Sequence, residues 1–175
     1  ANYTLMNRYF FTATVRDDGS SRFKDHWGLF PSFAFAWRMK DENNLKDIKW
    51  LSDLKFRAGY GVTGQQEGIS NYLWFKQYKK GQNYGQYPII GDGTIYTPLY
   101  YNDKLKWEKT TTYNLGLDFG ICNRLTGSID WYVRNTTDLI NSAPVAALAG
   151  SADKGIQNIG SMRNTGVELS LNYVA

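Results

Sequence analysis

Every second residue is apolar in several strand-length segments of this chain, most clearly at residues 54–62. The even positions of that segment hold Leu, Phe, Ala, Tyr and Val, while Lys55, Arg57 and two glycines fill the odd positions. Because the side chains of a β-strand point alternately to its two faces, this strand has one apolar and one polar face. About six predicted strands share the pattern, at residues 2–16, 27–39, 53–63, 107–120, 124–135 and 162–175. A transmembrane β-barrel requires such strands, since it faces lipid outside and water or polar packing inside.

The composition is compatible with a barrel although its average hydropathy is that of a soluble protein. Hydrophobic residues make up 42% of the chain, and the mean hydropathy is −0.48. No run approaches the roughly 18 apolar residues of a transmembrane helix. In an alternating strand the polar residues offset the apolar ones in the average hydropathy, so a low mean hydropathy does not exclude a barrel. The chain is rich in Tyr (13 residues) and Trp (6 residues), which favour membrane interfaces and also sugar- or peptide-binding surfaces.

Charge and cysteine content argue against several functions. The net charge of +4 is dispersed, without a Lys/Arg block, so no nucleic-acid partner is predicted. Cys122 is the single cysteine of the sequence, which excludes an internal disulfide and a cysteine-based metal cluster. We find no signal peptide and expect any export signal to lie outside this piece. We also find no constellation of catalytic residues and predict that the protein is not an enzyme.

The predicted connections alternate between short and long. A short helical turn, with Leu45, Ile48 and Leu51 at helical spacing and Asp41 or Asn43 as its cap, is predicted within residues 40–52. Outer-membrane barrels have long loops outside the cell and short turns on the periplasmic side. This rule predicts extracellular loops at residues 17–26, 64–106 and 136–161, and periplasmic turns at 40–52 and 121–123. Pro31 predicts a bulge or an edge within its strand.

The two faces of the predicted strands give two sets of candidate residues. The set predicted to face lipid is Leu54, Phe56, Tyr60, Leu115, Leu117, Phe119, Ile129, Trp131, Leu169 and Leu171. The set predicted to face the lumen is Lys55, Arg57, Asn114, Asp118, Asp130, Arg134 and Glu168. Asp130 and Glu168 lie near Arg134 and Arg124 in sequence. This favours ion pairs, in the barrel wall or with whatever fills the barrel, over the paired catalytic carboxylates of a glycosidase.

The longest predicted loop holds a dense set of aromatic residues. The candidates for contact with a substrate or a partner protein are Tyr72, Trp74, Tyr78, Tyr84, Tyr96 and Tyr100. Aromatic rings at such sites stack on sugar rings or fill interface pockets. The alternative is that they pack the loop against itself or against the barrel rim.

Metal and nucleotide sites are weakly supported. His26 is the single histidine of the sequence and has no cysteine partner, so no metal site is predicted there. Asp17, Asp18 and Asp25 offer carboxylates for a loop calcium ion, but turn chemistry explains the first two equally well. The G-x-G-x-x-G match at residues 59–64 lies within a strand rather than after one, which argues against a dinucleotide site.

Five ordered segments carry motifs that together indicate a family. They are RDDGSSRF with GLFPS (16–32), WLSDLKFRAGYGVTGQQ (50–66), LKWE with NLGLDF (105–119), NRLTGSIDWY (123–132) and NIGSMRNTGVEL (158–169). Their order and spacing resemble SusC/RagA-type, TonB-linked outer-membrane proteins of Bacteroidetes. The departures are small: Gln65 stands where the family often has Asn, and residues 101–104 replace its N-P-N.

The resemblance implies that residues 1–175 are part of a TonB-dependent receptor β-barrel domain. About six strands of a plugged, roughly 22-stranded barrel would lie here, with the plug domain and the remaining strands absent from this piece. Family members import bulky nutrients, namely glycans, oligosaccharides or in some cases peptides, across the bacterial outer membrane. They work with a SusD-like surface lipoprotein and contact TonB through an N-terminal part, and no cofactor is implied.

The residues alone leave other classes open. A passive porin or an adhesin would use the same alternating strands, and a soluble β-rich carbohydrate-binding module would also have one apolar face. A plug domain upstream would exclude a porin, and extraction of the full-length product without detergent would favour the soluble module.

Overall fold

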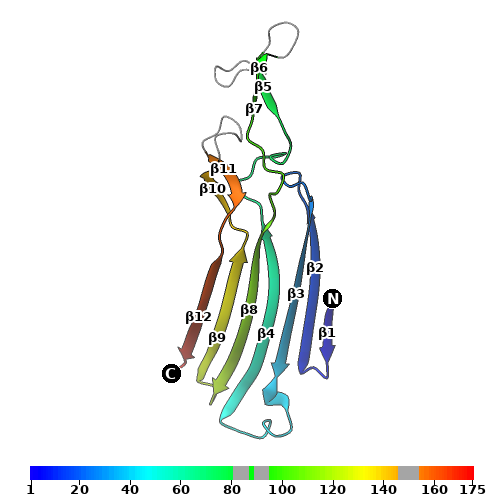
Figure 1. Cartoon of the computed structure of the whole chain (residues 1–175). Coiled ribbons are helices and arrows are strands. Elements are labelled where there is room, and N and C mark those ends of the chain that lie inside the picture. Colours follow the sequence, from blue (N-terminus) through cyan, green and yellow to red (C-terminus); the bar gives the residue numbers. More distant parts are fainter. Residues whose placement is uncertain (81–86, 89–94, 146–153) are drawn as a thin grey trace.

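A seven-stranded antiparallel sheet forms the body of the chain (Figure 1). The computed structural model describes residues 1–80, 87–88, 95–145 and 154–175. The strands of this sheet are β1 (Asn2–Leu5), β2 (Tyr9–Gly19), β3 (Trp27–Arg38), β4 (Leu51–Gln65), β8 (Glu108–Ile121), β9 (Leu125–Thr137) and β12 (Met162–Tyr173). Their spatial order is β1-β2-β3-β4-β8-β9-β12, so each strand lies beside the preceding strand of the same sheet. The all-β, antiparallel prediction is confirmed.

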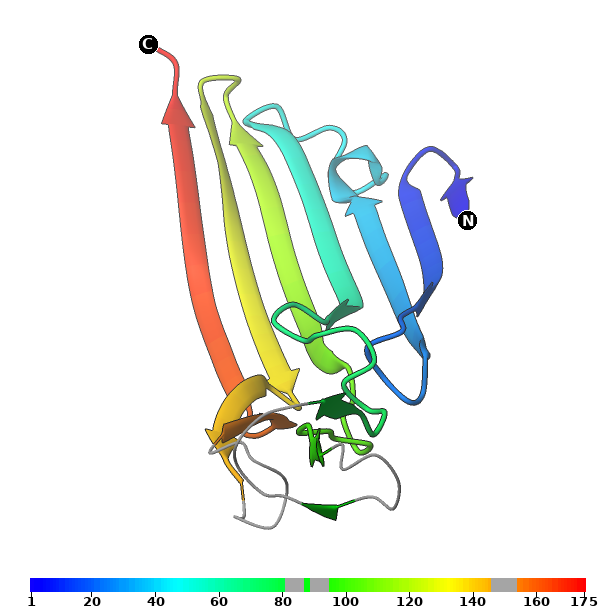
Figure 2. The same ribbon diagram turned by 90° about the horizontal axis from the view of Figure 1, so that it is seen from above.

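The sheet is open, with β1 at one edge and β12 at the other (Figure 2). Within the described residues, no helix has the length and apolar character needed to cross a membrane. A closed barrel would require further strands to join the two edges. The observed sheet is therefore the shape expected of a barrel segment.

The single strand predicted at residues 2–16 is wrong, because a tight turn divides it into β1 and β2. The backbone amide of Arg8 donates to the carbonyl of Leu5 at 3.0 Å. Met6 and Asn7, between them, have φ angles of 51° and 54°. Two successive positive φ angles are those of a type I′ turn, whose twist matches that of a hairpin. The alternation of apolar residues breaks at this turn.

The pairing register carries the predicted alternation across the sheet. One row of directly opposed residues contains Phe35, Ala58, Leu115, Trp131 and Val167, on β3, β4, β8, β9 and β12. Because side chains alternate with period two, the alignment of one row aligns the rows on either side of it. The apolar positions of all five strands consequently share one face, and their polar positions share the other.

Tight turns close one end of the sheet, at the bottom of Figure 1. The predicted turn between β8 and β9 is confirmed, with Cys122 and Asn123 both at a φ of 52°. The helical turn predicted between β3 and β4 is present only in part. The 3₁₀ helix η1 (Met39–Asp41) lies before the predicted apolar positions, the amide of Lys46 donates to the carbonyl of Glu42 at 2.9 Å, and Leu51 belongs to β4 instead of the helical turn.

The predicted cap of that helical turn is wrong. No side chain caps η1, and the Asp41 carboxylate instead lies 3.4 Å from the guanidinium of Arg38. The turn is held from another side, because Lys40 Nζ donates to three backbone carbonyls, those of residues 45, 46 and 48, at 2.8–2.9 Å. Pro31 behaves as predicted for a local edge, since the pairing of β3 with β4 begins at the next residue, Ser32.

The long connections contain strands that the sequence pattern did not reveal. Within residues 64–106 lie β5 (Tyr78–Lys80), β6 (Tyr87–Pro88) and β7 (Ile95–Pro98), which form a small sheet in the order β5-β7-β6. Within residues 136–161, β10 (Ile140–Pro144) pairs with β11 (Lys154–Asn158). These strands are too short to show a period.

A buried apolar cluster lies at the loop end of the sheet and consists of Phe23, Phe30, Ile69, Leu105 and Trp107. The ring of Trp107 lies 4.7 Å from that of Phe23 and 5.5 Å from that of Phe30. Phe30 occupies a position on the polar side of β3. The loops therefore pack toward the polar face of the sheet, and the cluster joins the β2–β3 turn to the β4–β8 connection.

Candidate functional site

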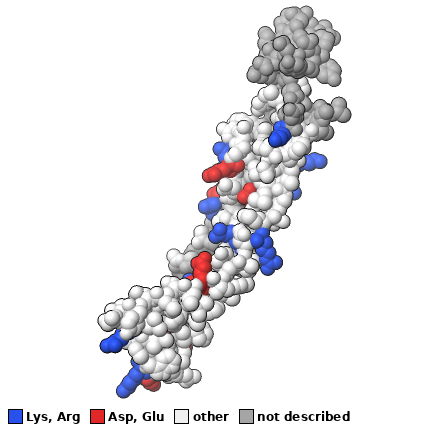
Figure 3. Space-filling model, turned by 90° about the vertical axis from the view of Figure 1, so that its left-hand side faces the viewer, with Lys and Arg blue, Asp and Glu red and all other residues white. Residues whose placement is uncertain are grey.

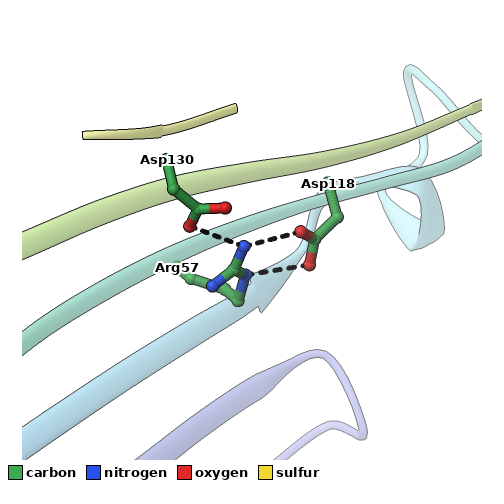
Figure 4. Close-up of polar contacts among 3 residues, drawn as sticks. All are labelled: Arg57, Asp118 and Asp130. Atoms are coloured by element: carbon green, nitrogen blue, oxygen red, sulfur yellow. Dashed lines mark hydrogen bonds and ion pairs between the residues drawn. The ribbon is translucent and has the colours of Figure 1, made fainter. Parts of the chain in front are cut away.

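Three charged side chains form a network on the polar face (Figure 4). Arg57, on β4, donates from Nε and Nη2 to the two carboxylate oxygens of Asp118 on β8, at 2.9 and 2.8 Å. The same Nη2 donates to Oδ1 of Asp130, on β9, at 2.8 Å. The fork of two bonds to Asp118 is the strong bidentate geometry of arginine and carboxylate. The network joins three adjacent strands.

Glycine makes this network possible. Gly116 lies directly between Arg57 and Asp130 in the cross-strand row. A Cβ at Gly116 would lie 2.5 Å from Asp130 Oδ1 and 2.8 Å from the guanidinium carbon of Arg57. Only a residue without a side chain leaves room for Arg57 to reach across β8.

The predicted ion-pair partners of Asp130 are wrong. Neither Arg134 nor Arg124 pairs with it, because Arg134 is four residues along the same strand and about 13 Å away at the usual rise per residue. Arg57 is its partner instead, two strands away. Proximity in sequence was a poor guide, since a strand separates residues that a helix would bring together.

The other predicted lumen-facing residues lie on the same polar face. Lys55 is directly opposite Asp118, and Glu168 is directly opposite Asp130. Asn114 and Arg134 lie nearer the loop end. Within the described part of the chain, Arg134 and Glu168 form no ion pair. Contact of these side chains with a lumen stays a prediction.

The apolar face is unusually exposed. Leu115, Trp131 and Leu169 expose 44%, 42% and 62% of their surface, and Leu171 and Ile129 are similarly exposed. The other half of the predicted lipid-facing set is half-buried among its neighbours: Leu54, Phe56, Tyr60, Leu117 and Phe119. Soluble monomers rarely expose a continuous apolar surface of this extent. Seen from the β12 edge, a broad area without charge separates the lower end from the charged middle (Figure 3).

A carboxylate anchors two aromatic rings at the turn end of this face. The Tyr9 hydroxyl and the Trp37 indole N–H donate to Glu42 Oε1 at 2.6 and 3.1 Å, and Arg8 donates to Oε2 at 3.3 Å. The two rings stack with centroids 5.9 Å apart. The hydrogen bond from Tyr9 lowers the pKa of the Glu42 carboxyl below its ordinary value.

Two of the loop aromatics have structural roles. The indole of Trp74 donates to the carbonyl of Ser21 at 3.0 Å, and the Tyr100 hydroxyl donates to the carbonyl of Ile156 at 3.0 Å. Burial raises the pKa of Tyr100. Both contacts join separate connections, as the packing alternative predicts.

Of the remaining four aromatic candidates, the structure describes the side chains of two. Tyr72 and Tyr78 expose 54% and 62% of their surface, and Tyr72 has a φ of 59°. Tyr84 lies outside the described residues, and Tyr96 is described as part of the backbone of β7. Contact with a substrate or partner stays a prediction for every residue of this set.

Of the three acids considered for a calcium ion, Asp18 alone has an ion-pair partner among the described residues, and Asp17 and Asp18 lie on β2 instead of in the loop. The Asp18 carboxylate lies 2.8 Å from Arg16, and the ring of His26 lies 2.6 Å from the carbonyl of Phe23. Among the described residues, no group of three acidic, histidine or cysteine side chains is arranged to hold a metal ion. A loop calcium site gains no support from this geometry, and the predicted lack of a cofactor stays a prediction.

Phe23, Phe30 and Trp107 are the important residues that the strand pattern missed. Phe23 is fully buried, and Phe30 and Trp107 expose 3% and 6% of their surface. A signal was present, because Phe30 is a large apolar residue at a polar position of its strand. Such a residue must be covered by another part of the chain, and here the loops cover it.

The chain matches known proteins over almost its whole length. A family model described as "TonB dependent receptor-like, beta-barrel" matches residues 1–174. The TonB-dependent receptor SusC of Bacteroides thetaiotaomicron is 51% identical over 98% of this chain and 17% of its own length. The TonB-dependent receptor P3 of Formosa agariphila is 39% identical, again over 98% of this chain and 17% of the relative.

Solved structures agree with the sequence relatives. The RagAB peptide importer in its open-open state superposes with a TM-score of 0.81 at 32% identity, over 97% of this chain and 18% of that one. The closed-closed state gives a TM-score of 0.79 at the same identity. These matches define the chain as one segment of a TonB-dependent receptor β-barrel. Within that class it belongs to the SusC/RagA family.

Proposed function

We propose that the full-length protein containing this chain imports bulky nutrients across the bacterial outer membrane, driven by TonB. The observation that carries the proposal is the exposed apolar face, which continues across five paired strands and is aligned by their register. Such a face is stable when lipid covers it. Membership of the TonB-dependent receptor family supplies the link to energised import.

The chain contributes part of the barrel wall in this proposal. The ten apolar residues named above face lipid, and the open edges at β1 and β12 are closed by further strands. A free strand edge in lipid would leave N–H and C=O groups unpaired, at several kcal/mol each. This penalty favours a closed barrel over an open sheet in the membrane.

The polar face lines the interior of the barrel. Lys55, Asn114, Arg134 and Glu168 face the lumen together with the Arg57–Asp118–Asp130 network. The network joins three strands and stiffens the wall without any catalytic role. We expect transport to proceed without a cofactor and without covalent chemistry.

The long connections form the extracellular surface. Tyr72 and Tyr78 are the exposed candidates for contact with a substrate or a SusD-like surface lipoprotein, while Trp74 and Tyr100 hold the loops in place. TonB would be contacted by parts of the full-length protein that are not in this chain. Glycans or oligosaccharides are the expected nutrients, and the match to the RagAB peptide transporter keeps peptides as the alternative.

Uptake by whole cells tests this function. Cells that express the full-length protein should accumulate a labelled oligosaccharide or peptide, and accumulation should stop when tonB is deleted or the proton gradient is collapsed. The protein should fractionate with outer membranes and require detergent for extraction. Uptake that persists without TonB, or extraction in buffer alone, would contradict the proposal.

A further inference from the structure

Two basic residues lie on the otherwise apolar face of the sheet. Lys109 on β8 and Arg163 on β12 have the same parity as Leu115 and Leu169 on those strands, so they point to the apolar face. Every other position that β4, β8, β9 and β12 present to this face holds an uncharged residue. Both basic residues are exposed, and within the described part of the chain neither forms an ion pair.

Both cations lie at the loop end, beyond a pair of aromatic rings. Tyr60 and Tyr113 are directly opposite each other on β4 and β8, with ring centroids 5.2 Å apart. Aromatic side chains mark the boundary between lipid and water in outer-membrane barrels. Arg163 lies two residues and Lys109 four residues closer to the loops than this row, or about 7 and 13 Å along the strands. This places both cations at the level of the lipid headgroups.

The surface between the two cations is polar. Thr111 and Asn135 lie in the same cross-strand row as Arg163, and Thr137 is directly opposite Lys109. At the usual spacings of a sheet, the Cα atoms of Lys109 and Arg163 are about 12 Å apart. The side chains of Lys and Arg are long and flexible and can lean along a surface toward a charged group. Both cations can therefore reach one group that lies over β9.

This surface does not depend on parts of the protein outside the chain. Lys109 has a described strand on each side, β4 and β9, so its neighbours on the apolar face are already in place. Further strands would join at the β1 and β12 edges, in the plane of the sheet. Whatever fills the barrel would lie against the opposite, polar face. The membrane boundary is therefore what meets the two cations.

The charges select an anion, and their place selects a lipid. Arg forms a fork of hydrogen bonds to phosphate, and Lys binds phosphate as a point charge. The acid that the strands present to this face is Asp17 on β2, three strands from Lys109 and thus about 14 Å away. With the loops outside the cell, the lipid at this level belongs to the outer leaflet. That leaflet of a bacterial outer membrane consists of phosphorylated glycolipids.

We propose that Lys109 and Arg163 form a contact site for the phosphate of an outer-leaflet glycolipid, with Thr111, Asn135 and Thr137 as its neutral hydrogen-bonding neighbours. The inference takes the orientation, with the loops outside the cell, from the proposed function. It adds to that function a lipid-binding surface that fixes the depth of the barrel in the outer leaflet. The site takes no part in moving the nutrient.

Binding to the purified full-length protein in detergent tests the site. The probes are monophosphoryl lipid A, the same lipid A after phosphatase treatment, and inorganic phosphate as a competitor. Lys109→Gln and Arg163→Gln each remove one cation of the site. Arg134→Gln is the matched control, because Arg134 lies directly opposite Asn164 and removing it takes a cation from the same level of the polar face. Heat-modifiable migration on gels confirms the assembly of each barrel.

We expect the wild-type protein to bind phosphorylated lipid A more tightly than the dephosphorylated form. Lys109→Gln and Arg163→Gln should each weaken the binding of phosphorylated lipid A about fivefold, as expected for one basic residue at a charged lipid surface. Neither change should alter the binding of dephosphorylated lipid A, and Arg134→Gln should bind both lipids like wild type. Lys109→Gln keeps the test decisive if Arg163→Gln does not assemble.

Equal affinity of the wild-type protein for the two lipids would overturn the inference. Unchanged affinity in both site variants, or an equal loss in Arg134→Gln, would do the same. Displacement of lipid A by millimolar inorganic phosphate would show a site for the small anion instead of a lipid. The cell uptake measurement separates this failure from that of the proposed function. If TonB-dependent uptake persists while the site variants bind lipid A like wild type, the lipid site is refuted and the import function stands.

Discussion

Replacing Leu115 with Arg should strongly disfavour assembly of the barrel in a membrane. Leu115 lies in the middle of β8, in the row that also contains Ala58 and Trp131, and exposes 44% of its surface on the apolar face. An arginine at the midplane of a transmembrane barrel raises the free energy of the folded state by roughly 2–4 kcal/mol. At 1.4 kcal/mol per factor of ten, the folding equilibrium should fall roughly 30- to 700-fold.

The matched control changes the next residue along the same strand. Asn114→Arg introduces the same side chain one position away, on the polar face, and should assemble far better than Leu115→Arg. The assay is folding of the full-length protein into lipid vesicles, followed by heat-modifiable gel migration and by urea titration of the folded fraction. Equal free energies of folding for the two variants would refute the assignment of the faces.

Three further perturbations test other parts of the structure. Arg57→Leu leaves two carboxylates without their cation and should lower the free energy of unfolding by about 1–3 kcal/mol in urea titrations. Adding Asp118→Asn to this variant should recover part of the lost stability. If Arg57→Leu alone causes no loss, the network does not stabilise the fold. The hydrogen-bonded Glu42 carboxyl has a lowered pKa in the folded state, so its contribution to stability is present above its ordinary pKa of 4.5 and is lost as the pH falls through the lowered pKa. Glu42→Gln should therefore flatten the dependence of the free energy of unfolding on pH in this acidic range. An unchanged pH dependence would contradict the role of the hydrogen bond. Phe23→Ala leaves a cavity at a fully buried site and should weaken loop packing by about 3–5 kcal/mol, measured as faster amide hydrogen exchange in the loops. Phe75→Ala, at an exposed position, is the control. Equal exchange rates in the two variants would contradict the stabilising role of the buried apolar cluster.

The strands of the sheet could be predicted because their alternation is long and strict. Residues 54–62 alternate without a break, and β4 contains all of them. The hairpin at Met6 and Asn7 was missed because the apolar alternation resumes with the same parity at Tyr9, which made the break look like an interruption within one strand. Asn7 was the available signal, since Asn tolerates the positive φ that this turn requires. The strands in the long connections were missed because two to five residues are too few to show a period.

The candidate site was predictable in its faces but not in its contacts. The alternation of side chains along each strand is enough to place Arg57, Asp118 and Asp130 on the polar face. Their joining by Arg57 depends on the register between strands and on the empty space at Gly116, which no local pattern reveals. The loop cluster around Trp107 likewise depends on contacts between segments far apart in the sequence.

Solvent accessibility along β9 tests the central claim, that one face of this sheet lies in lipid and the other lines a lumen. The full-length protein, with Cys122 replaced by Ser, is spin-labelled at single positions from residue 125 to residue 137 and inserted into vesicles. Collision rates with oxygen, which concentrates in lipid, should peak at Ile129, Trp131 and the other odd positions. Collisions with a water-soluble nickel complex should peak at Asp130, Arg134 and the other even positions. The opposite phase, or access of the nickel complex to both faces, would contradict the account.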